Sequence, residues 1–344
     1  MTNYKKIGVW QTAFLGDTVL TLPLLKALKD QYPDAEIHFF VRAGVESVFE
    51  GQPEITQVHP FAKRGKDKSL LAAYRLGKSI GQQGFDLWIS THTSLRSAIV
   101  AQATGIQRRI GYDAPWYNRV AYTETVPRRF DELEEIERIL QLLRPLGFDG
   151  PTPKAELVLP ESARIDADRF WAVHFDDQPV LGMHPGSTWP TKCWPVEYFS
   201  SIIDKATEAG VKVVLFAGPD EKEVAEQVKK GAEHGPDILD LSGKLSLPQL
   251  AAYLGKLDAY LTNDSGPMHL AWTQDVPLVA LFGPTVKELG FFPRGKNATV
   301  AETPLDCRPC GLHGPRTCPK GHHNCMRELT PEIVWNELRK KLNV

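Results

Sequence analysis

Short apolar segments alternate with amphipathic helical segments along most of the chain, and this alternation constrains the fold more than any other feature. In the first half, residues 7–10, 36–42 and 85–90 have the pattern of strands, and residues 17–31 have that of a helix. Successive strand–helix–strand units place their strands in parallel, with the helices covering the sheet. The chain is therefore predicted to be an α/β protein built on parallel sheets.

The second half repeats the alternation with clearer boundaries. Its expected strands span residues 180–184, 211–217, 238–241, 259–262 and 276–282, and its expected helices span residues 196–209, 220–232, 247–256 and 267–274. The length of 344 residues suits two domains. Because the stretch 147–179 opens with the breaker cluster GFDGPTP, we place the boundary near Pro160. We predict two Rossmann-like α/β/α domains, residues 1–160 and 161–344, facing each other across a cleft.

Charge is distributed unevenly along the chain. The net charge of −2 argues against a general nucleic-acid binder. Residues 61–130, however, hold twelve basic and four acidic residues, a local net charge of +8. This basic segment, interleaved with Trp116, Tyr117 and Tyr122, could face an anionic substrate or an anionic membrane surface. A solvated charged face is the alternative.

The N-terminal sequence and the cysteine content predict the compartment. MTNYKKIGVW lacks the apolar stretch of a secretory signal. No window approaches the 18 apolar residues of a membrane-spanning helix. Five cysteines without an export signal are typical of a reducing compartment, so we expect a cytoplasmic protein.

The loop after the first expected strand, QTAFLGDTVL, places Asp17 at the start of a helix. Functional groups of parallel α/β sheets gather at the carboxyl ends of the strands, where this loop lies. The helix dipole and the free backbone amides favour an ionised carboxylate, as a general base requires. A plain helix cap is the alternative. Pro23 lies inside the expected helix and is predicted to kink it.

Five small or polar loops follow the expected strands of the second half: HPGSTWPTK, AGPDE, SGKLS, TNDSGPMH and FGPT. Loops that share one edge of a sheet predict a ligand rim. In TNDSGPMH, Asp264 or Ser265 can cap a helix with Pro267 in its first turn, which leaves the amides after Gly266 free for a phosphate. His269 lies one turn further on; a buried structural histidine is the alternative.

Three other positions in these loops have a functional and a structural interpretation. Lys192 can neutralise a departing pyrophosphate, although lysines are usually solvated. Glu221 either caps its helix or accepts hydrogen bonds from the hydroxyls of a ribose or sugar. Trp189 and Trp194 either line the pocket or pack in the core.

The remaining motifs concern metals and cofactors. Four cysteines near the C-terminus have spacings seen in zinc sites: Cys307, Cys310, Cys318 and Cys325. A structural metal, a reduced thiol cluster and a loop that merely packs all remain open. GxGxxG and HExxH are absent. Residues 290–296, GFFPRGK, have P-loop spacing, but Asn297 stands where a Ser or Thr would hold Mg²⁺, so we reject that motif.

Together the motifs resemble one enzyme family. The stretches LGDTVLTLPLLKAL, HPGSTWPTKCWP, VVLFAGPDE, LTNDSGPMHLAW and VPLVALFGPT are similar, in this order, to the ADP-heptose:lipopolysaccharide heptosyltransferases of glycosyltransferase family 9. The tail CRPCGLHGPRTCPKGHHNCM resembles those of type II members. The resemblance implies a GT-B fold and an inverting transfer of L-glycero-D-manno-heptose from ADP-heptose, with no metal and no further cofactor. The implied acceptor is the anionic lipopolysaccharide core, heptosyl-Kdo2-lipid A, at the inner leaflet of the inner membrane.

The resemblance also implies roles for individual residues. Asp17 matches the family's catalytic carboxylate, and the second domain would bind the donor through Ser187, Thr188, Lys192, Glu221, Leu245, Asp264, Ser265, Gly266 and His269. Within this set, Ser187, Thr188 and Lys192 match the diphosphate-contacting stretch, Glu221 the acid at the ribose, and Leu245 the loop beside the adenine. The first domain would bind the acceptor. Two alternatives remain: a GT-B transferase or epimerase acting on another nucleotide sugar, and a non-catalytic protein that binds nucleotide sugars or glycolipids.

Overall fold

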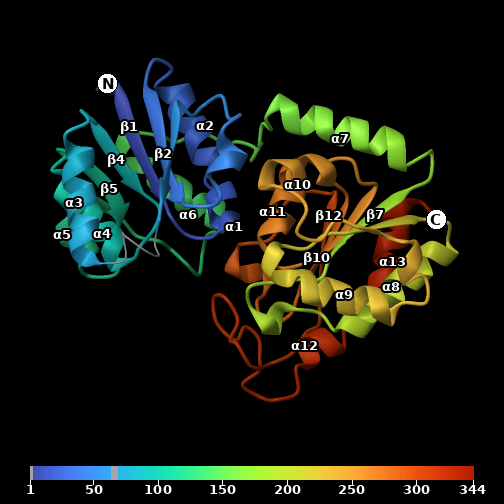
Figure 1. Cartoon of the computed structure of the whole chain (residues 1–344). Coiled ribbons are helices and arrows are strands. Elements are labelled where there is room, and N and C mark those ends of the chain that lie inside the picture. The colour runs from blue at the N-terminus through green and yellow to red at the C-terminus, as the bar shows by residue number, and fades with distance from the viewer. Residues whose placement is uncertain (1–2, 63–68) are drawn as a thin grey trace. The chain divides into compact units, whose positions relative to one another are not determined.

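The computed structural model describes residues 3–62 and 69–344. The chain divides into two compact units, Met1–Pro160 and Glu161–Val344. Each unit is built on one six-stranded sheet (Figure 1). Every strand pair in both sheets is parallel among the residues described, which confirms the predicted α/β class.

The sheet of the first unit has the strand order β3-β2-β1-β4-β5-β6, so the order reverses between β1 and β4. At such a reversal the loops at the carboxyl ends diverge and leave room for a ligand. The strands are β1 (Lys6–Gln11), β2 (Glu36–Arg42), β3 (Gln57–Phe61), β4 (Leu87–Ser90), β5 (Arg108–Tyr112) and β6 (Glu124–Val126).

The helices of the first unit correct one prediction. The single kinked helix expected over residues 17–31 is two helices, and Pro23 lies in the first turn of the second, where its missing N–H has no helical partner to lose. The helices are α1 (Leu15–Val19), α2 (Leu22–Gln31), α3 (Leu70–Gly81), α4 (Leu95–Thr104), α5 (Asn118–Ala121) and α6 (Glu135–Gln141), with short 3₁₀ turns at Glu46–Phe49 and Arg144–Leu146.

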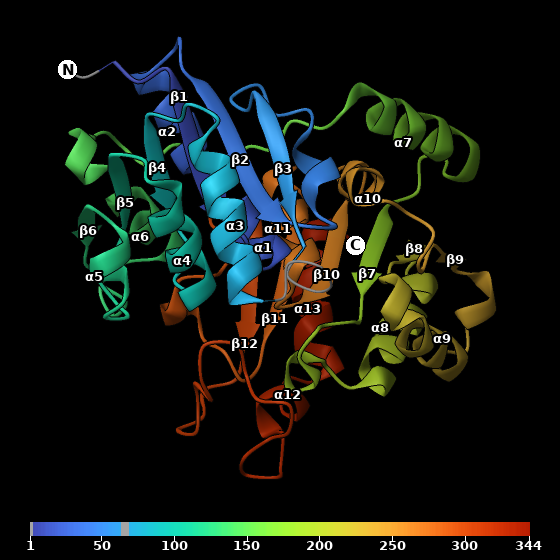
Figure 2. The same ribbon diagram turned by 60° about the vertical axis from the view of Figure 1, so that its left-hand side comes forward.

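The sheet of the second unit has the order β12-β11-β10-β7-β8-β9 and reverses between β10 and β7 (Figure 2). All five strands expected here are present, with ends within two residues of those expected. They are β7 (Val180–His184), β8 (Lys212–Leu215), β9 (Leu239–Asp240), β10 (Ala259–Asn263) and β11 (Leu278–Phe282). The rejected P-loop motif is followed instead by an edge strand, β12 (Ala298–Glu302).

The four helices expected in the second unit are also present, each ending within two residues of its expected bounds. They are α8 (Val196–Glu208), α9 (Lys222–Gly231), α10 (Leu247–Leu254) and α11 (Gly266–Thr273); α7 (Glu161–His174), α12 (Asn324–Arg327) and α13 (Pro331–Leu342) complete the unit. Apolar side chains of β7, β10 and β11 pack with those of α8 and α13 in one buried cluster. No described helix is both long and apolar enough to span a membrane.

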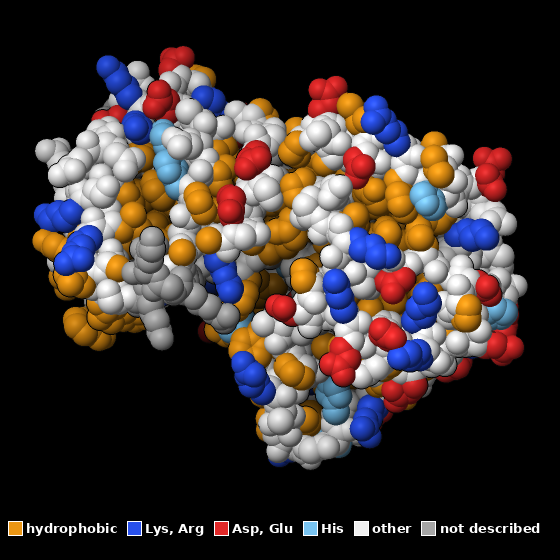
Figure 3. Space-filling model, in the orientation of Figure 1, with side chains coloured by type: hydrophobic (Ala, Val, Ile, Leu, Met, Phe, Trp, Pro, Cys, Tyr) orange, Lys and Arg blue, Asp and Glu red, His pale blue; other side chains and the backbone are white. Residues whose placement is uncertain are grey.

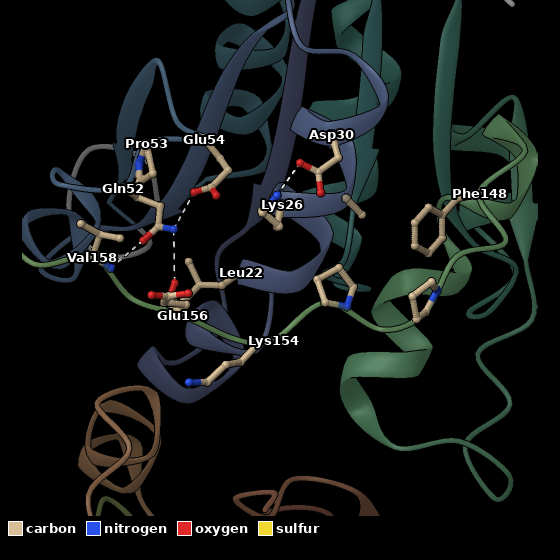
Figure 4. Close-up of a pocket in the computed structure, with 13 residues that line it drawn as sticks. Leu22, Lys26, Asp30, Gln52, Pro53, Glu54, Phe148, Lys154, Glu156 and Val158 are labelled. Carbon is tan, nitrogen blue, oxygen red and sulfur yellow. Dashed lines mark hydrogen bonds and ion pairs between the residues drawn. The ribbon is translucent and has the colours of Figure 1, made fainter.

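The segment that leads out of the first unit is fastened to it by Gln52. The Gln52 side chain accepts a hydrogen bond from the amide of Val158 (3.0 Å) and donates one to the carbonyl of Glu156 (3.2 Å) (Figure 4). A cavity of about 590 Å³ lies beside this segment. Its charged lining has both signs, including an ion pair between Lys26 and Asp30, so it shows no preference for an anion or a cation.

Helices α3 and α4 pack closely because α3 carries glycine at the contact. A Cβ on Gly77 would stand 2.5 Å from the carbonyl oxygen of Val100 and 2.6 Å from the Cβ of Ala103. Real Cβ atoms do not approach backbone oxygens so closely, so any side chain here would force the helices apart.

We therefore predict that Gly77→Ala destabilises the protein by about 1–3 kcal/mol, because overpacking outweighs the helix propensity of alanine. Propensity alone predicts the opposite sign, a gain of about 1 kcal/mol. Urea unfolding measures the difference. Ser79→Ala, at an exposed position of the same helix, is the control and should change the unfolding free energy by less than about 0.5 kcal/mol.

Candidate active site

The second unit brings the predicted donor-binding residues to one edge of its sheet. The loops after β7, β8, β9 and β10 all leave carboxyl ends of parallel strands, and they carry Ser187, Thr188, Lys192, Glu221, Leu245, Asp264, Ser265 and Gly266. His269 follows within α11. Thr188 is exposed, whereas Ser187 and Leu245 are half-buried. The five polar loops thus line one edge, as the sequence predicts.

A buried ion pair lies at the strand reversal of this edge. Lys192 ends the short turn after β7, and Asp264 follows β10, the neighbouring strand across the reversal. The Lys192 Nζ lies 2.5 Å from the Asp264 Oδ2, with the two side chains only 10% and 8% exposed. The Thr285 hydroxyl donates a second hydrogen bond to the same oxygen, at 2.7 Å. A buried ammonium of this kind is held by its partner and by the loops around it.

Asn263 connects the two loops that carry this pair. Its Nδ2 donates to the carbonyl of Pro185 (2.8 Å), and its Oδ1 accepts from the amide of Trp194 (3.1 Å). Trp194 is buried and its Nε1 donates to the carbonyl of Leu329, so core packing is its role. The sequence analysis did not single out Asn263 or Thr285, although both lie in the polar loops TNDSGPMH and FGPT.

Glu221 makes the contact expected of a helix cap. Its Oε2 accepts a hydrogen bond from the amide of Gly218 (2.9 Å), as a cap does, and lies 3.3 Å from the Nε2 of His184. Burial alone would raise the pKa of Glu221, but the hydrogen bonds from His184 and Gly218 hold it below its ordinary value. The carboxylate is therefore an ionised acceptor at the edge. A Cβ on Gly186 would stand 2.3–2.6 Å from that carboxyl group, so any larger residue there would displace the Glu221 carboxylate from this position.

The start of α11 differs from the prediction in one respect. Ser265 occupies the N-cap position, but its side chain makes no capping hydrogen bond. The Asp264 carboxylate binds Lys192 and Thr285 instead of capping the helix. The prediction of a side-chain cap is therefore wrong, because the neighbouring lysine is the stronger partner for the carboxylate.

His269 is buried beside the ion pair. Burial, aided by the Lys192 charge and opposed by that of Asp264, lowers its pKa to about 4. Its Nδ1 has no hydrogen-bond partner among the described residues. His269 is therefore a neutral imidazole at pH 7, and it contributes no positive charge to the site.

Asp17 lies in the first unit, in the first turn of α1 and after β1, which flanks the reversal of that sheet. It is half-buried, and its Oδ2 accepts a hydrogen bond from the amide of Phe14 (3.2 Å). The capping alternative is thus present in the structure.

A buried arginine–glutamate network lies close to Asp17, and the sequence analysis did not identify it. Glu135 accepts from Arg128 Nη2 at 2.9 and 3.1 Å and lies 2.9 Å from Arg138 Nε. Burial raises the pKa of Glu135, opposed by the two arginines, and the charge of Asp17 adds to the rise. Burial alone would lower the pKa of Arg128, but the charge and hydrogen bonds of Glu135 raise it above its ordinary value, and the charge of Asp17 adds to the rise. The charges of Glu135 and Arg128 therefore interact with that of the candidate base.

The basic segment 61–130 is not one continuous charged face. Arg108 pairs with Glu124 at 2.6 Å, and Arg109 donates to the carbonyl of Ala121, so both arginines serve the fold. Tyr122 is buried in the core and Tyr117 is half-buried, while Trp116 is 78% exposed. Lys63, Arg64, Lys66 and Lys68 lie outside the described residues.

The cysteine-rich tail packs on the loops of the second unit. The His323 Nε2 lies 2.8 Å from the carbonyl oxygen of Thr191. The His313 ring stacks on that of Trp189, with 6.0 Å between the ring centres. The buried Arg308 donates to the carbonyl of Thr285 at 2.7 Å. Within residues 3–62 and 69–344, no group of three or more His, Cys, Asp or Glu is placed to hold a metal ion. The four cysteines named above therefore keep their open interpretations.

Comparison with known proteins decides the family. The model of the family described as "Glycosyltransferase family 9 (heptosyltransferase)" matches residues 73–317. The chain belongs to glycosyltransferase family 9. The predicted family and the predicted enzyme class, a glycosyltransferase, are confirmed.

Individual curated relatives align with most or nearly all of the chain. Lipopolysaccharide heptosyltransferase 3 of Escherichia coli is 28% identical, over 79% of this chain and 82% of its own. Lipooligosaccharide heptosyltransferase 2 of Campylobacter jejuni is 25% identical, over 98% of each chain.

Solved structures share the fold. The glycosyl transferase family 9 structure from Veillonella parvula has a TM-score of 0.88 at 25% identity, covering 100% of this chain and 98% of its own. Escherichia coli heptosyltransferase WaaC with ADP-2-deoxy-2-fluoro heptose has a TM-score of 0.74 at 19% identity, covering 97% and 99%. The predicted GT-B type of α/β fold is confirmed.

The ion pair yields a prediction about stability. Lys192→Met should destabilise the protein by about 3 kcal/mol, because it leaves the buried Asp264 charge without its counterion. Lys192→Met/Asp264→Asn should regain most of that loss, since a neutral amide can still accept from Thr285. Lys230→Met, in the exposed pair with Glu226, is the control and should cost at most about 0.5 kcal/mol. Equal losses in the single and double variants, measured by urea unfolding, would contradict the coupling.

His269 yields a prediction about pH. Its pKa is about 4 when folded and near 6.5 when unfolded, so below pH 6.5 the unfolded chain takes up a proton that the folded chain refuses. Stability is therefore lost as the pH falls from about 6.5 to about 4, by up to about 3 kcal/mol. His269→Gln should lose about 2–3 kcal/mol less than wild type when urea unfolding is compared at pH 7 and pH 4.5. Parallel losses would show that His269 ionises normally.

Proposed function

We propose that this chain transfers L-glycero-D-manno-heptose from ADP-heptose to the lipopolysaccharide inner core, with heptosyl-Kdo2-lipid A as the acceptor. The observation that carries the proposal is the Lys192–Asp264 pair at the strand reversal, within a family of heptosyltransferases. Two observations about relatives support it. One is the similarity to heptosyltransferase 2 over the whole chain, and the other is that WaaC, which shares the fold, was solved with ADP-2-deoxy-2-fluoro heptose.

The second unit would bind the donor. A leaving ADP carries its negative charge on the diphosphate, and Lys192 is a buried cation at the loop edge where a nucleotide would lie. The amides that open α11, without a side-chain cap, are further donors for phosphate oxygens. The ionised Glu221 suits the ribose hydroxyls, because a carboxylate accepts two such bonds. Ser187, Thr188, Leu245, Asp264, Ser265, Gly266 and His269 would complete the donor site.

The first unit would bind the acceptor and supply the base. Direct displacement at the anomeric carbon needs one group that removes the proton of the acceptor hydroxyl, and Asp17 is the candidate. Its backbone hydrogen bond to Phe14 fixes the carboxylate in one orientation. The chemistry proposed asks for no bound metal, because Lys192 and the helix amides would stabilise the leaving diphosphate.

Asp17→Asn tests the proposal with the fold held constant. Asparagine keeps an oxygen that can accept from the Phe14 amide but cannot remove a proton, so heptosyl transfer should fall at least about 100-fold. Affinity for ADP and the unfolding free energy should stay unchanged. The measurement is transfer from ADP-heptose to Kdo2-lipid A, with and without one heptose attached, read by mass spectrometry.

The two acceptors and the variant separate the alternatives. Transfer only to the heptosylated acceptor supports the proposed step, whereas transfer to bare Kdo2-lipid A shows that the enzyme acts one step earlier. An Asp17→Asn protein as active as wild type would remove Asp17 as the base. ADP-heptose binding with no transfer to either acceptor would indicate another acceptor or a binding protein.

A further inference from the structure

The first unit exposes large apolar side chains in the segments that follow the carboxyl ends of its strands. Among the described residues of this unit they are 41–78% exposed, and they are Phe14, Leu70, Leu71, Tyr74, Leu95, Trp116 and Val120. Soluble proteins expose scattered apolar side chains routinely, but a gathered set marks an interaction surface. Their common feature is position: each lies in a segment that follows the carboxyl end of a strand.

The topology places these segments along one edge of the sheet. Phe14 follows β1, Leu70 begins α3 after β3, Leu95 begins α4 after β4, and Trp116 precedes α5 after β5. Because these strands are all parallel, their carboxyl ends share one edge. Helix α3 packs beside α4, and α4 packs beside α5 (Figure 1). The set forms the apolar edge, defined by the seven side chains above.

Cationic side chains accompany the apolar edge. Arg75 and Lys78 are exposed on α3, and Arg119 is exposed on α5. The Lys78 ammonium lies 5.7 Å from the ring centre of Tyr74, and the Arg42 guanidinium lies 5.2 Å from that of Phe14. In Figure 3, hydrophobic and basic side chains lie together at the lower left, over the region where Figure 1 shows α3, α4 and α5. Aromatic rings with adjacent cations are typical of surfaces that sit in lipid headgroups.

We propose that the apolar edge docks the first unit on the surface of an anionic lipid bilayer. The apolar side chains would enter the headgroup region, and Arg75, Lys78 and Arg119 would contact anionic headgroups. The proposal rests in part on the proposed function, because Asp17 lies at the same edge of the same sheet. An acceptor anchored in that bilayer would then present its sugar to the base without leaving the membrane.

Vesicle co-sedimentation of the full chain tests the docking surface without donor or acceptor. Wild type should bind phosphatidylethanolamine–phosphatidylglycerol vesicles at least about tenfold more tightly than phosphatidylcholine vesicles. Leu71→Ser/Trp116→Ser should lose at least about tenfold in binding to the anionic vesicles, because two apolar anchors are gone. Val173→Ser/Ile333→Ser removes two exposed apolar side chains from the second unit and should bind like wild type.

Each other outcome contradicts the proposal. Wild type that ignores the vesicles, or a Leu71→Ser/Trp116→Ser protein that binds like wild type, overturns it. If that variant instead turns a dimer into a monomer on sedimentation analysis, with vesicle binding unchanged, a second copy of the chain covers the edge. Transfer to a water-soluble acceptor should be equal in the variant and wild type, so a failure of the proposed catalysis remains distinguishable from a failure of docking.

Discussion

The buried contact between Lys192 and Asp264 is the interaction on which the candidate donor site depends. Its two residues come from neighbouring strands at the reversal of the second sheet, so the pair fixes the loop after β7 relative to the loop after β10. An ammonium held in a mostly buried place is costly without its counterion, and the same property makes it a strong partner for a diphosphate. One contact therefore both holds the two loops together and places the lysine proposed to bind the diphosphate.

Hydrogen bonds from neighbouring residues hold the loops that carry this pair. Asn263 joins the same two loops through backbone groups of Pro185 and Trp194. Arg308, from the cysteine-rich tail, donates to the carbonyls of Gly283 and Thr285 in the loop after β11. Residues that support a site through backbone contacts hold its geometry without touching a ligand. The tail therefore supports the loops of the candidate donor site.

The sequence predicts the framework of the molecule well, because strand and helix patterns in an α/β protein are local. The five strands and four helices predicted in the second unit end within two residues of their observed bounds, and the polar loops were expected at one edge. The break between α1 and α2 was missed because Pro23 suits a first turn as well as it kinks a helix. Motif resemblance, rather than periodicity, supplied the roles proposed for the candidate site residues.

The hydrogen-bond and ion-pair partners of the candidate site residues could not be predicted from the sequence, because these contacts join residues far apart in the chain. Asp264 or Ser265 was expected as a cap, but Lys192, 72 positions away from Asp264, takes the Asp264 carboxylate. The network of Arg128, Glu135 and Arg138 beside Asp17 has no local motif, and it depends on how the segment after β6 folds back toward α1. Likewise, the basic segment could be counted from the sequence, but only the fold shows which of its arginines pair internally.

The central claim is that the edge of the second sheet binds the diphosphate of an adenine nucleotide sugar. Calorimetric titration of the intact chain with ADP-heptose, ADP, AMP and UDP tests it most directly. We expect ADP-heptose and ADP to bind at least about tenfold more tightly than AMP, which lacks the second phosphate, and than UDP, which lacks the adenine. Equal affinities for AMP and ADP would contradict the claim, because the buried lysine would then have no diphosphate to hold.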